Sequence, residues 1–152
     1  MKTTLSQHFL AEFSASEVDP YRDDHPEKDG EPCRSCDTPD GTHAFDTWDI
    51  AVATIEEAYS RAFTAARESY KRKHGEDAVG LSAMRVRVDI PDEAIPALIS
   101  MLVNDLDKWS DWIRSGDMSA GAYVNAGNRL IEKLRRERDE KGIVSPCEYW
   151  FN

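Results

Sequence analysis

The chain has 152 residues, 40% of them hydrophobic, which is enough for one globular domain with a buried core and excludes a wholly disordered protein. Its 29 acids against 19 bases give a formal net charge of −10, and such a surface repels nucleic-acid phosphates and anionic membranes. No apolar run approaches the roughly 20 residues of a membrane helix, and three cysteines do not make a disulfide framework, so we expect a cytoplasmic protein.

Residues 1–45 are predicted to form a short helix followed by an acidic, irregular arm. Phe9, Leu10 and Phe13 recur at helical spacing, which indicates a helix over about residues 5–13. This periodicity stops over residues 14–45, where four prolines and two glycines exclude a helix or a central strand. Residues 1–50 hold twelve acids and four bases, so nearly all of the net charge lies in this part of the chain.

Residues 46–152 are predicted to form a helical core of the same domain. Apolar residues at steps of three and four indicate long amphipathic helices over residues 46–73, 92–114 and 119–141. Each of these helices is followed by a glycine, which is typical of a helix end. The last two turns of the third helix read RRERDEK and have no apolar residue to bury. We therefore expect these turns to project into solvent.

One strand is predicted between the first and second long helices. Residues 84–90 read MRVRVDI, an alternation of apolar and polar residues that is typical of a half-buried strand. A lone strand leaves its backbone groups unpaired, so it needs a partner from the proline-rich segment, from the C-terminal tail or from a second copy of the chain. The last choice would give a homodimer through residues 84–90. The predicted fold class is mainly α (α+β), with three long helices and this strand or a small sheet.

A C-x-x-C pair lies in the acidic arm, in the sequence EPCRSCDTPDGTH. Cys33 and Cys36 could supply half of a tetrahedral zinc site, which His43 and Cys147 could complete. A thioredoxin-like redox pair would follow a strand and open a helix, and this pair does neither. Three interpretations stay open: a structural zinc site, a transient redox pair, and two exposed thiols in a loop.

Catalytic motifs are absent from the sequence. There is no G-x-S-x-G, no H-E-x-x-H, no phosphate loop and no dinucleotide-binding glycine pattern, which favours a protein that is not an enzyme. Asp105, Asp107 and Asp111 crowd the second long helix and are interpreted as a solvated acidic face. The basic residues of the third helix are explained by its dipole and by ion pairs one turn apart.

The predicted function is that of a small, acidic, non-enzymatic interaction protein of the inhibitor or adaptor type. Its partner should be basic, such as a nucleic-acid-binding protein, because opposite charges steer association. Nucleic-acid mimics among phage and plasmid anti-defence proteins have this character. The alternative is a zinc-stabilised regulatory module that contacts DNA through the basic helix over residues 120–141. The acids expected to contact the partner are Asp19, Asp23, Asp24, Glu27, Asp29 and Glu31.

Overall fold

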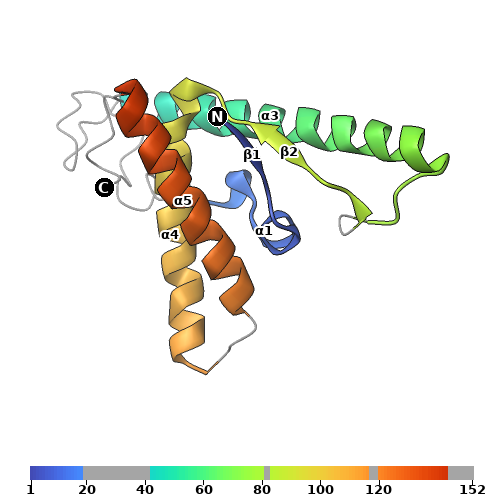
Figure 1. The fold of residues 1–152 in the computed structure, drawn as a ribbon. Helices are drawn as coiled ribbons and strands as arrows, with labels where there is room; N and C mark the ends of the chain where they lie inside the picture. The colour runs from blue at the N-terminus through green and yellow to red at the C-terminus, as the bar shows by residue number, and fades with distance from the viewer. Residues whose placement is uncertain (19–41, 81–82, 117–119, 144–152) are drawn as a thin grey trace.

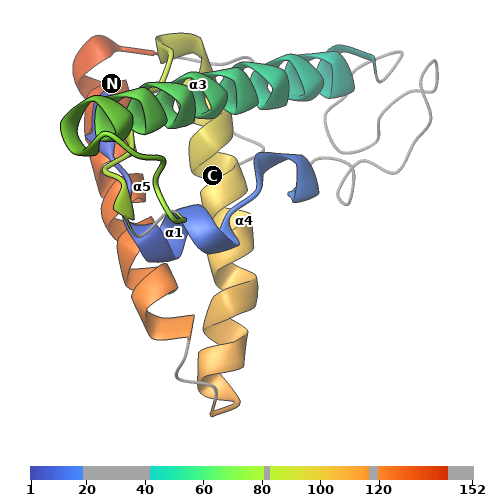
Figure 2. The ribbon, with the colours of Figure 1, turned by 90° about the vertical axis from the view of Figure 1, so that its right-hand side faces the viewer.

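Three long helices and a two-stranded antiparallel sheet make up the fold, as the sequence predicts. The computed structural model describes residues 1–18, 42–80, 83–116 and 120–143, and over residues 42–48 it describes the backbone alone. Helices α4 and α5 lie side by side, and α3 crosses one end of this pair (Figures 1 and 2). In chain order the elements are β1 (Lys2–Thr4), α1 (Gln7–Glu12), η1 (Ala15–Glu17), α3 (Thr42–His74), β2 (Arg87–Asp89), η3 (Asp92–Ala94), α4 (Ile95–Arg114) and α5 (Gly121–Lys141).

The packing of α4 against α5 forms the centre of the core. Pro96 lies in the first turn of α4, where its missing N–H breaks no helical hydrogen bond, and Leu98 and Leu102 are fully buried. Gly127 allows α5 to approach closely, because a Cβ at this position would stand 2.6 Å from Cδ1 of Leu106. The predicted bounds of both helices are confirmed to within a few residues.

Helix α3 begins at Thr42, earlier than the predicted Asp46 or Thr47, and ends at His74. Its buried face consists mostly of alanines, so that the helix lies close to the rest of the core. Beyond Ala66, only Tyr70 is even half-buried before the helix ends. Residues 67–74 therefore extend past the core as an overhang of about two turns (Figure 1). The buried side chains are Ala51, Ile55, Ala58, Ala62 and Ala66.

The strand predicted over residues 84–90 is β2, and its partner is the N-terminal strand β1. This partner is not one of the three sources that the sequence analysis names. Thr3 lies opposite Val88, and the pairing extends at both ends. The Leu5 amide donates to the carbonyl of Val86 at 3.2 Å, and the Ile90 amide donates to that of Met1 at 2.7 Å. Since β1 occupies one edge of β2, the strand has a partner within one chain, and a homodimer through residues 84–90 stays a prediction.

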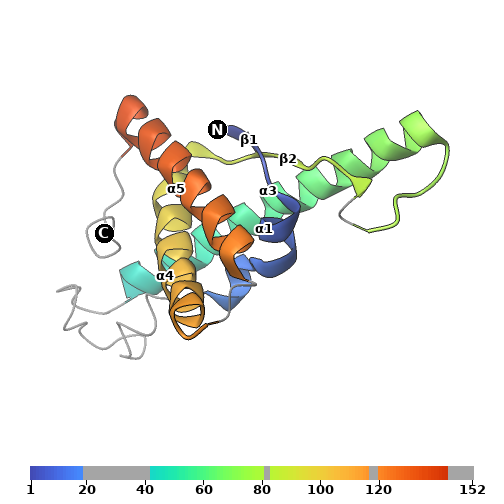
Figure 3. The ribbon, with the colours of Figure 1, turned by 60° about the horizontal axis from the view of Figure 1, so that its bottom comes forward.

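The N-terminal segment joins the same hydrophobic core as the long helices. The predicted short helix is α1, which contacts α5 (Figure 3). Ser6 caps it by accepting a hydrogen bond from the Phe9 amide at 3.2 Å. Phe9, Phe13 and Val18 are buried, so the chain packs against the core as far as residue 18. The acidic residues from Asp19 onward follow directly in the sequence. Among the described helices, none is long and apolar enough to cross a membrane.

Most of the RRERDEK residues at the end of α5 are exposed, as expected, but the last turn is also linked to η3. Lys141 Nζ lies 2.8 Å from Oδ1 of Asp92 in η3 and 2.8 Å from Oε1 of Glu137. The side chain of Arg138 is only 15% exposed. The reason is topological: α5 runs antiparallel to α4, which brings its last turn next to the residues that precede α4.

Candidate functional site

The residues predicted to bind zinc or a partner fall almost entirely outside the described residues. This applies to the acids between Asp19 and Glu31 and to Cys33, Cys36 and Cys147. His43 lies in the first turn of α3, but only its backbone is described. In the part of the chain that the structure describes, no three His, Cys, Asp or Glu side chains are placed to hold a metal. The three interpretations of the C-x-x-C pair remain predictions.

Asp105 of α4 is not on a solvated face, which corrects part of the sequence interpretation. Asp107 and Asp111 are exposed, and Asp111 accepts a hydrogen bond from Arg114 at 2.8 Å. Asp105, in contrast, is half-buried and accepts a short hydrogen bond from the hydroxyl of Tyr123 on α5. It lies three residues after Leu102, so that it points closer to the interface with α5 than the other two acids do.

Tyr123 stands at the centre of a cluster of aromatic rings from four elements. Its ring is 4.9 Å from that of Trp109 and stacks on Phe9 at 5.8 Å, measured between centroids. Phe9 stacks in turn on Phe13, whose ring meets the edge of Tyr59 from α3 at 6.3 Å. The hydroxyl of Tyr59 is buried with no hydrogen-bond partner among the described residues. This aromatic cluster thus joins α1, α3, α4 and α5.

Burial sets the protonation behaviour of this cluster. It raises the pKa of Tyr59 far above its ordinary value, so that phenol stays neutral at physiological pH. Burial raises the pKa of Tyr123 as well, and the neighbouring Asp105 adds to this effect. The pKa of Asp105 is raised above 3.8 mainly by burial, although the hydrogen bond from Tyr123 opposes the change. The charged form of Asp105 is therefore less favourable in the folded protein than in the unfolded chain.

Replacement of Asp105 by Asn should stabilise the protein progressively as pH rises. Because the folded-state pKa of Asp105 is raised, its stabilising contribution is complete at low pH and is lost as pH rises through that pKa. The Asn side chain is uncharged at every pH, and its oxygen still accepts from Tyr123. The difference in unfolding free energy between Asp105→Asn and the wild type should increase from pH about 3.5 to pH about 7 in urea titrations. Asp107→Asn, at an exposed site, is the control and should give a smaller change; an equal change would contradict the assignment.

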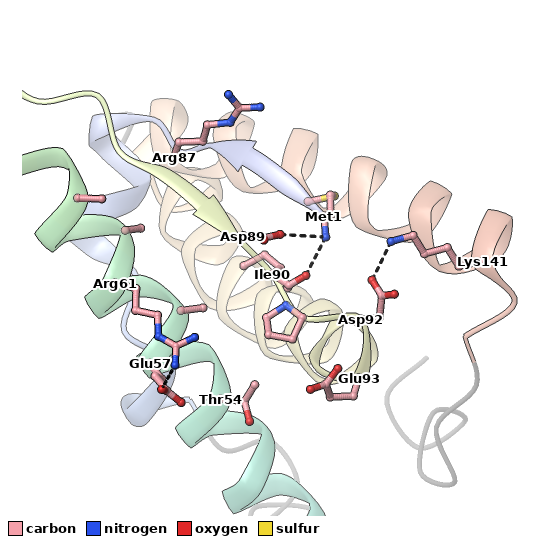
Figure 4. Close-up of a pocket in the computed structure, with 14 residues that line it drawn as sticks. Met1, Thr54, Glu57, Arg61, Arg87, Asp89, Ile90, Asp92, Glu93 and Lys141 are labelled. Carbon is pink, nitrogen blue, oxygen red and sulfur yellow. Dashed lines mark hydrogen bonds and ion pairs between the residues drawn. The ribbon is translucent and has the colours of Figure 1, made fainter. Parts of the chain in front are cut away.

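A charged cleft of 780 Å³ lies between α3, β2, η3 and the end of α5 (Figure 4). Figure 4 shows opposite charges paired around its rim. Glu57 and Arg61 pair across one turn of α3, and Asp92 accepts from Lys141. The N-terminal nitrogen of Met1 lies 3.7 Å from Asp89 Oδ1 and donates to the carbonyl of Ile90 at 2.8 Å.

These ion pairs limit the chemistry that is available in the cleft. The hydrogen bond from Lys141 lowers the pKa of Asp92, and the same bond raises the pKa of Lys141, so both groups are charged at neutral pH. The hydroxyl of Thr54, on the wall of the cleft, donates a hydrogen bond to the carbonyl of Ile50 at 2.8 Å. Among the described residues, no cysteine, histidine or serine lines this cleft. Glu57, Arg61, Asp89, Asp92 and Lys141 already have partners of opposite charge, and the residues described in this cleft include no nucleophile and base that face each other.

Comparisons with protein-family models, with curated proteins and with solved structures gave no match to this chain.

Proposed function

We propose that this protein is a small, acidic, non-enzymatic interaction protein of the inhibitor or adaptor type, which binds a basic partner through residues 19–31. The observation that carries the proposal is the concentration of charge. Residues 19–41 contain eight acids and three bases, so half of the net charge of −10 lies in 23 residues. A dense row of carboxylates matches the Lys and Arg side chains with which a nucleic-acid-binding protein contacts phosphates.

The fold supports this proposal by the way it anchors the two flanks of the segment. Val18 is 5% exposed and belongs to the hydrophobic core. Element η1, which precedes the segment, contacts α3, which follows it. The acidic residues are therefore carried between two elements that pack on each other.

Neutralising the acids of the segment should slow association with a basic partner. The variant replaces Asp19, Asp23, Asp24, Glu27, Asp29 and Glu31 by Asn or Gln. Stopped-flow fluorescence with a labelled peptide of Lys and Arg, and then with a basic protein that co-purifies, measures the association rate against salt concentration. We expect a decrease on the order of tenfold at low ionic strength and a flatter salt dependence, because steering by charge is lost. The melting temperature should stay the same or rise slightly.

A second variant with the same change of charge provides the control. It neutralises six exposed acids elsewhere, which are Glu56, Glu68, Glu76, Asp107, Glu132 and Glu140. This variant should associate nearly as fast as the wild type, since these acids are spread over several helices. If both variants slow association equally, only the total charge matters and the proposed binding segment is wrong. If neither does, recognition takes place on the helical faces.

A further inference from the structure

Two adjoining hollows lie along β1 and α5, and none of the described residues that line them is a carboxylate. One hollow, of 390 Å³, lies between α5 and the segment that includes β1 and α1, and the other, of 630 Å³, lies between the β1–β2 sheet and Lys133. The two hollows share Thr3, Thr4 and Lys133, so they form one surface, which we name the β1–α5 groove. Its cationic side chains are Lys2, Arg85, Arg87, Arg129 and Lys133. In a chain with 29 acids and 19 bases, this local excess of positive charge stands out.

The cations of the groove, like others such as Arg72 and Arg136, form no ion pair within the described residues, whereas some cations of the protein do. Arg61, Lys71 and Arg114 each form an ion pair with a nearby carboxylate. Within the part of the chain that the structure describes, no cation of the β1–α5 groove does so; Arg129 donates instead to the backbone carbonyl of Asn125 at 3.3 Å. The positive charge of this groove is therefore available to an external anion.

The fold itself places these cations along one surface. In the extended segment before and within β2, Arg85 and Arg87 are exposed, while the valines that alternate with them are buried. On α5, Arg129 and Lys133 are one turn apart, at about 6 Å along the axis. The antiparallel register places Lys2 opposite Asp89. That carboxylate lines the neighbouring charged cleft, which Arg87 also lines, and its Oδ1 is 3.7 Å from the Met1 nitrogen.

The remaining lining of the groove favours a phosphate chain over a protein surface. Its large apolar side chains, Leu5, Phe9 and Leu130, are 7%, 2% and 5% exposed, so they offer almost no apolar area. The centre of a protein interface is rich in apolar and aromatic contacts, whereas interfaces with nucleic acids are more polar and strongly positive. Exposed hydroxyl and amide groups of Thr4, Ser6 and Asn125 add neutral donors of the kind that contact phosphate oxygens.

We propose that the β1–α5 groove binds the phosphate backbone of a nucleic-acid strand without base selectivity. This surface is built from other residues than the acidic segment that is proposed to bind a basic partner, and it lies partly on the sheet rather than on the helix over residues 120–141 alone. The net charge of −10 opposes such binding, but charges more than about 8 Å away are largely screened at physiological ionic strength. The affinity should thus be low and strongly dependent on salt.

The test uses the full chain and a fluorescein-labelled oligothymidylate of about 20 nucleotides, with fluorescence anisotropy measured from about 50 to 200 mM KCl. Five cations predict a slope of log K against log salt of about −3.5, since each contributes about −0.7 on a single strand. The variant Arg85→Gln, Arg87→Gln, Lys133→Gln should reduce this slope to about −1.4 and weaken binding at least tenfold at the lowest salt.

A matched variant removes three cations that lie outside the groove and are paired with acids, Arg61→Gln, Lys71→Gln and Arg114→Gln. It should bind the oligonucleotide nearly as well as the wild type. Equal weakening by both triple variants, or no binding by the wild type at the lowest salt, would overturn the proposal. The proposal would also be overturned if a labelled polyglutamate peptide bound as tightly as the oligonucleotide and with the same salt dependence. That result would assign the groove to an acidic protein segment. If the groove variant does not fold, the single changes Arg85→Gln and Lys133→Gln, both at exposed sites, take its place.

Discussion

Replacing Tyr123 by Ala is expected to lower the free energy of unfolding by about 3–5 kcal/mol, the range for removing a large buried aromatic side chain. Tyr123 is 2% exposed, and its ring contacts those of Phe9 and Trp109. Because the aromatic cluster joins α1, α3, α4 and α5, a cavity at its centre weakens several helix contacts together. Urea unfolding followed by circular dichroism at neutral pH gives the change in free energy.

The variant Tyr123→Phe separates the ring from its hydroxyl. It keeps the packing but removes the hydrogen bond to Asp105, which should cost about 1.5–3 kcal/mol because the acceptor is charged. In the background of Asp105→Asn this cost should fall, since the acceptor is then neutral. A loss for Tyr123→Ala no greater than that for Tyr123→Phe would mean that the ring itself contributes little, in conflict with the structure.

Thr3→Pro is expected to lower the free energy of unfolding by about 2–4 kcal/mol, because it breaks the pairing of β1 with β2. Leu5 donates to the carbonyl of Val86, and Ile90 donates to that of Met1. Antiparallel pairs alternate in type, so Thr3 and Val88, midway between these two pairs, also form a hydrogen-bonded pair. Proline at position 3 has no N–H to donate, and it leaves the carbonyl of the buried Val88 without its partner.

Thr4→Pro is the matched control for the sheet. Residue 4 belongs to the other type of pair, so its N–H points away from β2, and proline is tolerated at such positions of an edge strand. Chemical unfolding should show a loss below about 1 kcal/mol for this variant. Similar losses for the two proline variants would indicate that the pairing register differs from the one described.

The long helices could be predicted from sequence because their burial is periodic. Residues such as Leu98, Leu102 and Leu106 recur on one face, and this pattern depends only on local spacing. The sequence predicts the start of α3 four residues late, since Thr42 and the residues after it carry little apolar periodicity. A glycine such as Gly75, with φ of +72°, marks the end of a helix in the sequence as well as in the structure.

The partner of β2 could not be predicted in the same way. Strand β1 is three residues long, Lys2–Thr4, and a single buried residue, Thr3, shows no alternation that a sequence pattern could detect. The pairing joins residues more than eighty positions apart, so it depends on how α1 and α5 pack around it. The hydrogen bond between Asp105 and Tyr123 also arises from tertiary packing, here of α4 against α5, although both residues lie on helices that the sequence predicted.

The acidic segment and the β1–α5 groove also differ in whether the sequence alone could predict them. The acidic segment is evident from composition alone, and its role stays a prediction because residues 19–41 lie outside the described structure. The β1–α5 groove could not be predicted, since its cations come from β1, from the residues around β2 and from α5. No short stretch of the sequence contains more than two of these cations. In the sequence, Arg85 and Arg87 appear only as the polar side of a predicted strand.

The overhang of α3 can change in length without affecting the core. Since residues 67–74 lie beyond the buried face that ends at Ala66, the packing of the core does not fix the length of the helix there. Adding or removing a turn in this stretch would shift the loop that follows without opening a cavity. The overhang is therefore the place where related chains can differ in length, and where a fluorescent label or a fused domain can be attached with least disturbance to the fold.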